Sequence, residues 1–337
     1  MLEEKRKIYL KIEHICKWFP MRRKISDIFR GKPAHYVKAV DDVSFDLYKG
    51  ENLGIVGESG CGKSTLARTV IRVYEPTSGE ILLDGKDISG ISGKSLRKAR
   101  DKMQMVFQDP YSSLDPKMTV YSILKEVLLV HHICSKQEVD QKIEELLTMT
   151  GLSKEVASRY PGEFSGGQRQ RVCIARALAS SPGFIIADEP VSALDVSIQA
   201  QILNLLKKLQ KDLHLTVMFI SHDLNVIHHV SDRVAVMYLG SIVEEGKTED
   251  IFASPLHPYT QILLRAAPDL DPLNRREQSV IEGDLPSPIC MPNGCRFHPR
   301  CPYCQDICRS MKPKIQEMAD GRKVACHFPL KKEKNNE

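Results

Sequence analysis

The sequence lacks any apolar run of the roughly 18 residues that a membrane-spanning helix requires. Its first residues, MLEEKRKIYLKIEHICKWF, are charged throughout and lack the apolar core of a secretory signal. The 48 Lys and Arg residues exceed the 43 Asp and Glu residues by only five, and no single long basic tract is present. Charge alone therefore does not argue for nucleic acid as a partner. We expect a cytoplasmic protein that does not span the bilayer.

The ten cysteines are unevenly distributed along the 337 residues. Four are scattered through the first 173 residues, whereas six lie between positions 290 and 326. In a reducing compartment, such crowding favours a metal site over disulfides.

Apolar periodicity predicts an α/β fold. Residues 38–56 predict a strand, a Lys-Gly turn and a buried strand, and the glycine-rich stretch that follows leads into a helix. Amphipathic segments predict a helical insert over about 95–175. The apolar runs FIIADEP and LTVMFISHDL predict two further buried strands on either side of a helix. Strands that alternate with helices indicate a parallel sheet covered on both faces.

Proline becomes frequent after about residue 254, and the core periodicity fades there. We therefore predict a main domain over 8–254 and a small, loop-rich appendage over 255–330. The final residues, 331–337 (KKEKNNE), predict a disordered tail.

A phosphate-binding loop is predicted at residues 57–65, GESGCGKST. The pattern G-x-x-x-x-G-K-[ST] lies between a predicted strand and a predicted helix, as this loop requires. Successive backbone N–H groups can then surround phosphate oxygens at a helix N-terminus. We expect Lys63 to reach the β- and γ-phosphates of a nucleotide and Ser64 to ligate Mg²⁺. The predicted nucleotide-binding residues of this loop are Ser59, Gly60, Cys61, Gly62, Lys63, Ser64 and Thr65.

Adjacent carboxylates end one of the predicted strands. Asp188 suits the Mg²⁺ shell, and Glu189 suits a base that polarises the attacking water. His222 follows the next buried run and could contact a γ-phosphate, although a histidine in such a place is more often a structural hydrogen-bonding residue. Gln108, in MVFQDP, is unremarkable when it is taken singly.

A second loop, FSGGQ at 164–168, also has backbone amides suited to an anion. Together the phosphate loop, Gln108, FSGGQ, ADEP, SALD and SHD, in this order and spacing, resemble an ATP-binding cassette (ABC) ATPase over about residues 8–250. That resemblance implies a P-loop NTPase fold of ABC type, with a RecA-like core, an antiparallel β subdomain and a helical subdomain. It also implies that two cassettes pack head to tail. The signature residues Ser165, Gly166, Gly167 and Gln168 would then close over ATP held by a partner's phosphate loop.

The same resemblance implies further roles. Gln108 would sense the γ-phosphate, join Ser64 and Asp188 around Mg²⁺, and couple to a membrane subunit, while Asp195 would link the two sites. An aromatic residue ahead of the first strand would stack on adenine. Phe19 matches best, and Tyr36 is its rival. Phe164 stands where the family usually has Leu, a change that leaves the anion-binding amides untouched.

Three longer stretches, MVFQDPYSSLDPKMTV, RYPGEFSGGQRQRVCIARAL and SPLHPYTQILL, resemble the ATPase subunits of dipeptide and oligopeptide importers. Such a subunit implies a second ATPase chain, two membrane permeases, an extracytoplasmic peptide-binding protein and a place at the cytoplasmic face of the membrane. The second chain would be a different ATPase in the transporter, or a second copy in isolation. Importers of nickel or another small solute are an alternative. Two further alternatives are a soluble ABC ATPase and an iron–sulfur sensor. The 102 positions from Lys63 to Ser165 leave too little room for the long coiled-coil arm of a DNA-repair ATPase.

Four cysteines of the appendage, Cys295, Cys301, Cys308 and Cys326, could together hold Zn²⁺ or an iron–sulfur cluster. Peptide-importer ATPases resemble this stretch, including HPRCPY and VACH, and the resemblance implies a [4Fe-4S] cluster with a structural role. Zinc and uncoordinated thiols are the alternatives. Cys290 and Cys304 depart from the pattern and are expected to be spare thiols.

Overall fold

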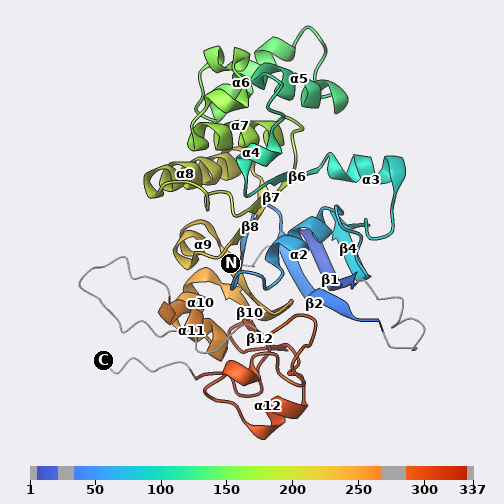
Figure 1. Ribbon diagram of the computed structural model, residues 1–337, viewed down its shortest axis with the longest axis vertical. Helices are drawn as coiled ribbons and strands as arrows, with labels where there is room; N and C mark the ends of the chain where they lie inside the picture. Colours follow the sequence, from blue (N-terminus) through green and yellow to red (C-terminus); the bar gives the residue numbers. More distant parts are fainter. Residues whose placement is uncertain (1–5, 22–33, 267–285, 332–337) are drawn as a thin grey trace. The chain divides into compact units, whose positions relative to one another are not determined.

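The computed structural model describes residues 6–21, 34–266 and 286–331 (Figure 1). The predicted tail therefore lies outside the described residues, apart from Lys331. The chain forms two compact units that interleave in sequence. The first comprises Met1–Leu10, Leu47–Asn52 and Leu83–Ile220, and the second comprises Lys11–Asp46, Leu53–Leu82 and Ser221–Glu337.

Parallel strands form the centre of the first unit. The strands β6 (Met103–Val106), β7 (Phe184–Asp188) and β8 (Thr216–Ser221) are neighbours in this order. Every residue of β7 and β8 is buried. Their sequences are almost continuous apolar runs because both faces of such a sheet are covered.

Helices make up most of the remainder of the first unit. In α5, buried side chains recur at positions 120, 123, 124 and 128, which is the spacing of one helix face. The unit also holds the short strand β5 (Lys86–Asp87) and the 3₁₀ turns η1 (Lys154–Ser158) and η2 (Pro161–Glu163). Its helices are α3 (Gly93–Arg100), α4 (Pro110–Ser113), α5 (Val120–Val130), α6 (Val139–Met149), α7 (Gly166–Leu178) and α8 (Val196–Leu213).

One strand interrupts the predicted helical insert of 95–175. The segment β6 pairs in parallel with β7, with Met103 opposite Phe184. Four residues are too few for periodicity to separate a buried strand from a helix segment. The strand was therefore missed.

The second unit contains two sheets. In one, β2 (Tyr36–Tyr48), β1 (Ile8–Pro20) and β4 (Ser78–Leu83) are neighbours in this order. In the other, β3 (Asn52–Val56) pairs in parallel with β9 (Arg233–Tyr238), which forms a hairpin with β10 (Ser241–Lys247). The short strands β12 (Lys323–Val324) and β11 (Gln316–Glu317) continue this sheet beyond β10. The C-terminal residues thus extend the sheet that contains β3, the strand directly before the phosphate loop.

Buried polar contacts attach the helices that follow β10. The carboxylate of Glu244 accepts hydrogen bonds of 2.8 Å from the backbone N–H groups of Leu256 and His257. Burial raises the pKa of Glu244, and these two N–H groups partly oppose that rise. The helices of this unit are α2 (Lys63–Val70), α9 (Leu224–Val230), α10 (Thr248–Ala253), α11 (Pro258–Ala266) and α12 (Asp306–Ser310), with the 3₁₀ turn η3 (His298–Arg300).

Within the described ranges, no helix combines the length and the apolar character needed to cross a bilayer.

The fold predicts a stability effect at the central strand β7. Phe184 is fully buried, so Phe184→Ala should lower the free energy of unfolding by about 3–5 kcal/mol, from lost transfer energy and a residual cavity. Urea denaturation followed by circular dichroism measures this change. Val196 is 81% exposed, and Val196→Ala should stay within about 0.5 kcal/mol of the parent. Equal effects of the two substitutions would contradict the burial pattern.

Candidate functional site

The predicted phosphate loop connects β3 to α2 through close backbone contacts. Gly62 caps α2 with φ +108°, and a Cβ atom there would lie 2.1 Å from the carbonyl oxygen of Ala39. A Cβ atom on Gly57 would lie 2.1 Å from the carbonyl oxygen of Met237. Only glycine allows either approach, so the loop conformation depends on both residues.

The ammonium group of Lys63 is folded into the loop. Its Nζ atom donates hydrogen bonds to the carbonyl oxygens of Gly57 at 2.7 Å and Glu58 at 3.0 Å. The residue is only 5% exposed. Phosphate oxygens can take the place of these neutral acceptors, and the N-terminus of α2 adds a partial positive charge at the same place.

The other predicted nucleotide ligands lie around this lysine. Ser59 and Gly60 are exposed, whereas Cys61 is buried. Burial raises the pKa of the Cys61 thiol. Ser64 and Thr65 are half-buried in the first turn of α2.

The structure brings two predicted residues of the first unit together. The side-chain nitrogen Nε2 of Gln108 donates a 2.9 Å hydrogen bond to Oε2 of Glu189, 81 positions along the chain. Glu189 has φ +47°, a left-handed conformation that is uncommon outside glycine and recurs at functional sites. Its backbone N–H donates to the carbonyl of Ile220 at 2.9 Å, which fixes this turn. Asp188, the last residue of β7, is 2% exposed.

The remaining γ-phosphate and metal candidates are divided between the units. Ser64 and His222 belong to the second unit, whereas Gln108 and Asp188 belong to the first. His222 is exposed at the end of β8. The next residue, Asp223, caps α9 by accepting a 2.8 Å hydrogen bond from the N–H of Asn225. Asp195 occupies the N-cap position of α8 without a side-chain capping bond.

The predicted signature residues begin α7. Ser165 and Gln168 form a capping box, in which the serine hydroxyl accepts from the N–H of Gln168 and the glutamine Oε1 accepts from the N–H of Ser165. The pattern S-x-x-Q was the signal for this cap, and the sequence analysis missed it. A Cβ atom on Gly167 would lie 2.5 Å from Cγ2 of Ile198 in α8. The amides of Gly166 and Gly167 belong to the first turn, whose N–H groups have no acceptor within a helix.

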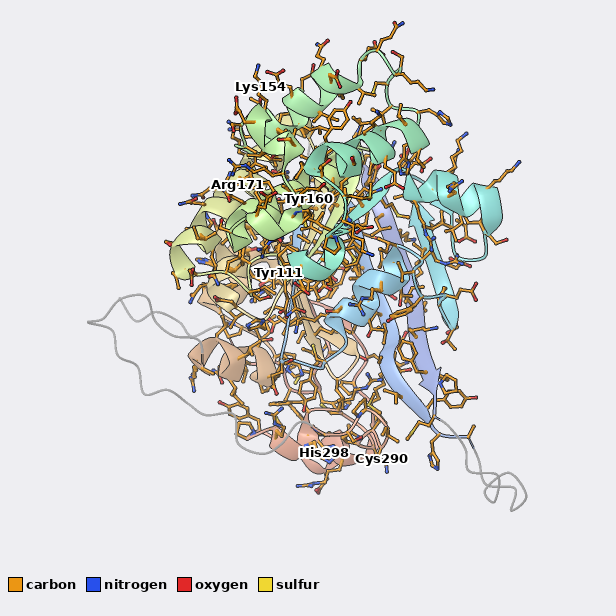
Figure 2. All side chains as sticks on the ribbon, turned by 45° about the horizontal axis from the view of Figure 1, so that its top comes forward. Tyr111, Lys154, Tyr160, Arg171, Cys290 and His298 are labelled. Carbon is orange, nitrogen blue, oxygen red and sulfur yellow. The ribbon has the colours of Figure 1, made fainter. Side chains whose placement is uncertain are left out.

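Two aromatic residues near these elements were also missed. The guanidinium of Arg169 lies 3.6 Å from the ring centroid of Tyr111, which is 65% exposed. Figure 2 shows Tyr111 and Tyr160 on the helical part of the first unit, together with Arg171. Both tyrosines lie within the longer stretches that resemble peptide-importer ATPases, but the sequence assigned neither of them a role.

The two candidate adenine-stacking rings make different contacts. Phe19 packs edge-on against Tyr74, with ring centroids 5.3 Å apart. The ring centroids of Tyr36 and Trp18 lie 6.3 Å apart, and Tyr36 is 42% exposed. The choice of Phe19 stays a prediction.

The four predicted cluster ligands line one small cavity with Phe297 and His327. The backbone N–H of Cys295 donates to the carbonyl of Cys308 at 2.8 Å, which ties two of these residues together. Burial raises the pKa values of Cys301 and Cys326 to about 11, and the neighbouring cysteines add to the rise. None of the ten cysteines, all within the described residues, forms a disulfide. Figure 2 shows Cys290 and His298 in this C-terminal part of the second unit.

The cavity provides the soft donors that zinc or an iron–sulfur cluster requires. However, no group of three or more His, Cys, Asp or Glu side chains in the described residues is arranged to hold a metal ion. The four thiols therefore face a common space without the tight arrangement of a single-ion site.

Comparisons with known proteins match both parts of the chain. Residues 40–192 match the family model described as ABC transporter, and residues 243–308 match the one described as oligopeptide/dipeptide transporter, C-terminal region. An oligopeptide transport ATP-binding protein of Bacillus subtilis, AppF, is 53% identical over 95% of this chain and 97% of its own length. A probable peptide ABC transporter ATP-binding protein of Sinorhizobium fredii is 52% identical over 94% of this chain and 89% of its own.

Solved structures resemble the larger part of the chain. A dimer of the ATP-binding cassette MJ0796 in a post-hydrolysis state, bound to ADP and Pi, has a TM-score of 0.61 and 32% identity over 71% of this chain and 98% of that one. The cbiO1 protein of Clostridium perfringens has a TM-score of 0.62 and 29% identity over 73% of this chain and 91% of that one. These likenesses confirm the predicted α/β fold of ABC type. On this evidence the chain belongs to the ABC transporter family of ATPases, among members that carry an oligopeptide/dipeptide transporter C-terminal region.

Proposed function

We propose that this chain hydrolyses Mg-ATP to drive the uptake of dipeptides or oligopeptides through membrane permeases. The observation that carries the peptide assignment is the match of residues 243–308 to the C-terminal region of oligopeptide and dipeptide transporters. Relatives at about 50% identity are named as peptide transport proteins, which supports peptides over nickel and a transporter over a soluble ATPase.

In this proposal, water attacks the γ-phosphorus and releases ADP and phosphate. Glu189 orients the water and accepts its proton, and its hydrogen bond to Gln108 places the two side chains for this task. Lys63 stabilises the charge that develops on the phosphate oxygens. When bound, Mg²⁺ would neutralise phosphate charge, and Ser64, Gln108 and Asp188 would hold it, while His222 would contact the γ-phosphate. Phe19 would stack on the adenine ring.

The signature residues would act on the nucleotide of a second ATPase chain. The first-turn amides of α7 and its partial positive charge suit a γ-phosphate. The capping box leaves this role open, because it uses the Ser165 hydroxyl and the Gln168 amide rather than the N–H groups of Gly166 and Gly167. The second chain would be a different ATPase in the transporter and a second copy in isolation. The assembly would lie on the cytoplasmic face of the membrane, where an extracytoplasmic binding protein supplies the permeases with peptide.

We further propose that residues 8–254 form the nucleotide-binding domain and that residues 255–330 form a C-terminal region that holds a [4Fe-4S] cluster. A cubane spreads its four thiolates further apart than a single zinc ion does. The support for this proposal is that all four cysteines line one cavity, because four thiolates are a donor set for such a cluster as well as for zinc. When bound, the cluster would cross-link a region with little apolar core of its own.

Glu189→Gln tests the base. The variant should bind ATP like the parent, while its turnover number falls at least about 100-fold, because the amide cannot accept the proton. Phosphate release and equilibrium binding of an ATP analogue measure the two quantities. Glu126→Gln, an exposed substitution in α5, is the control. A normal turnover number in Glu189→Gln would remove this residue from the role.

Mixing two inactive variants tests the shared site. Lys63→Ala and Ser165→Arg should each lose ATPase activity alone. Their mixture should regain about a quarter of the parent activity, since half of random dimers are mixed and each of these keeps one intact pair of loops. Activity that stays absent in a mixture shown by crosslinking to contain mixed dimers would contradict a head-to-tail site.

Metal analysis tests the cysteine assignment. Protein purified without oxygen should contain about four iron and four sulfide atoms per chain and absorb broadly in the visible range. Cys301→Ser should lose the iron, the sulfide and the visible absorption. Cys290→Ser should retain them, because Cys290 does not line the cavity. One zinc atom per chain, or no metal at all, would instead support the zinc or thiol alternative.

A further inference from the structure

We propose that Arg300 and Tyr259, both from the C-terminal side of the chain, are positioning residues that hold the phosphate loop in its nucleotide-binding shape. The proposal rests on the nucleotide-binding function of that loop. It makes the C-terminal region a part of the nucleotide site rather than a separate appendage.

The first contact is an ion pair with the second residue of the loop. One guanidinium nitrogen of Arg300 lies 3.1 Å from each carboxylate oxygen of Glu58, 242 positions earlier in the sequence. The side chain of Arg300 is 5% exposed and that of Glu58 is 21% exposed. Since solvent screens such a pair only weakly, removal of one partner leaves the other charge poorly compensated.

The second contact holds the backbone of the same loop residue. The N–H group of Glu58 donates a 2.9 Å hydrogen bond to the hydroxyl oxygen of Tyr259 in α11. The ring of Tyr259 is fully buried and packs against Tyr238 and Phe297, with centroids 4.6 and 5.4 Å away. This aromatic cluster fixes the position of the hydroxyl group, so the loop is held at a side chain and at an amide.

Both contacts act on the residue that also positions the catalytic lysine. The carbonyl groups of Gly57 and Glu58 are the acceptors for Nζ of Lys63. If Glu58 shifts, these carbonyls and the amides that follow shift with it. Nucleotide affinity should therefore depend on Arg300, although this side chain reaches the loop through Glu58 rather than touching the nucleotide.

Arg300 also lies directly before Cys301, at the end of η3. Arg300 is thus next in sequence to a residue that lines the four-cysteine cavity, while its guanidinium group contacts Glu58 of the phosphate loop. The ion pair between Arg300 and Glu58 therefore connects the four-cysteine cavity to the phosphate loop.

Calorimetric titration of the full-length protein with Mg-ADP tests the proposal without turnover. Arg300→Ala should raise the dissociation constant about tenfold, Arg300→Lys should lie between this variant and the parent, and Tyr259→Phe should weaken binding in the same direction. Arg309→Ala is the matched control, because it removes an exposed arginine from the same region and should not change affinity. Steady-state kinetics should show the loss mainly in KM for ATP, with kcat within about twofold of the parent.

A double-mutant cycle separates positioning from general damage. Glu58→Gln should weaken ADP binding to a similar extent, and the double variant Glu58→Gln with Arg300→Ala should be no weaker than either single variant. Circular dichroism and thermal unfolding check that each variant folds, and Glu58→Gln probes the pair even if Arg300→Ala does not fold. Unchanged affinity in folded Arg300→Ala, or fully additive effects in the cycle, would overturn the proposal. Failure of the parent protein to bind ADP would instead contradict the proposed function itself.

Discussion

The structure depends on a buried ammonium group enclosed by a loop that only glycine can form. Lys63 is 5% exposed and donates to backbone carbonyls of its own loop. Burying a charge on neutral acceptors alone is costly, and a phosphate group relieves that cost by supplying opposite charge. The loop can enclose the lysine because Gly57 and Gly62 lack a Cβ atom, which at either position would lie 2.1 Å from a neighbouring carbonyl oxygen. In the proposed nucleotide site, a bound phosphate group would therefore compensate the charge of Lys63.

Residues from later parts of the second unit contact this loop. The sheet that begins at β3 continues through β9 and β10 to two short strands from the C-terminal region. Glu244 of β10 holds the backbone just before α11, and Tyr259 of α11 accepts a hydrogen bond from the phosphate loop. The chain after β10 therefore returns to the sheet of the second unit, and Arg300, which lies on this returning chain, reaches Glu58.

In the first unit, the residues of the proposed site also have structural roles. Ser165 and Gln168 cap α7, so these two signature residues also stabilise the start of the helix. The cap does not use the N–H groups of Gly166 and Gly167, which stay available for an anion. Glu189 takes a left-handed conformation at the end of β7, where its side chain meets Gln108. A strained backbone and a long-range hydrogen bond at one turn are typical of a site shaped for chemistry rather than for stability.

The sequence by itself determined the phosphate loop, the acidic pair at the end of β7 and the alternation of strands and helices, because each requires particular residue types at fixed local spacing. It could not reveal β6, since four residues carry too little periodicity. It also left open which ring stacks on adenine and whether the cysteines hold a metal. Only the tertiary structure decided which distant residues meet, such as Gln108 with Glu189 and Arg300 with Glu58. No spacing rule connects positions 242 apart, because their contact follows from how strands and helices pack and not from the local chain.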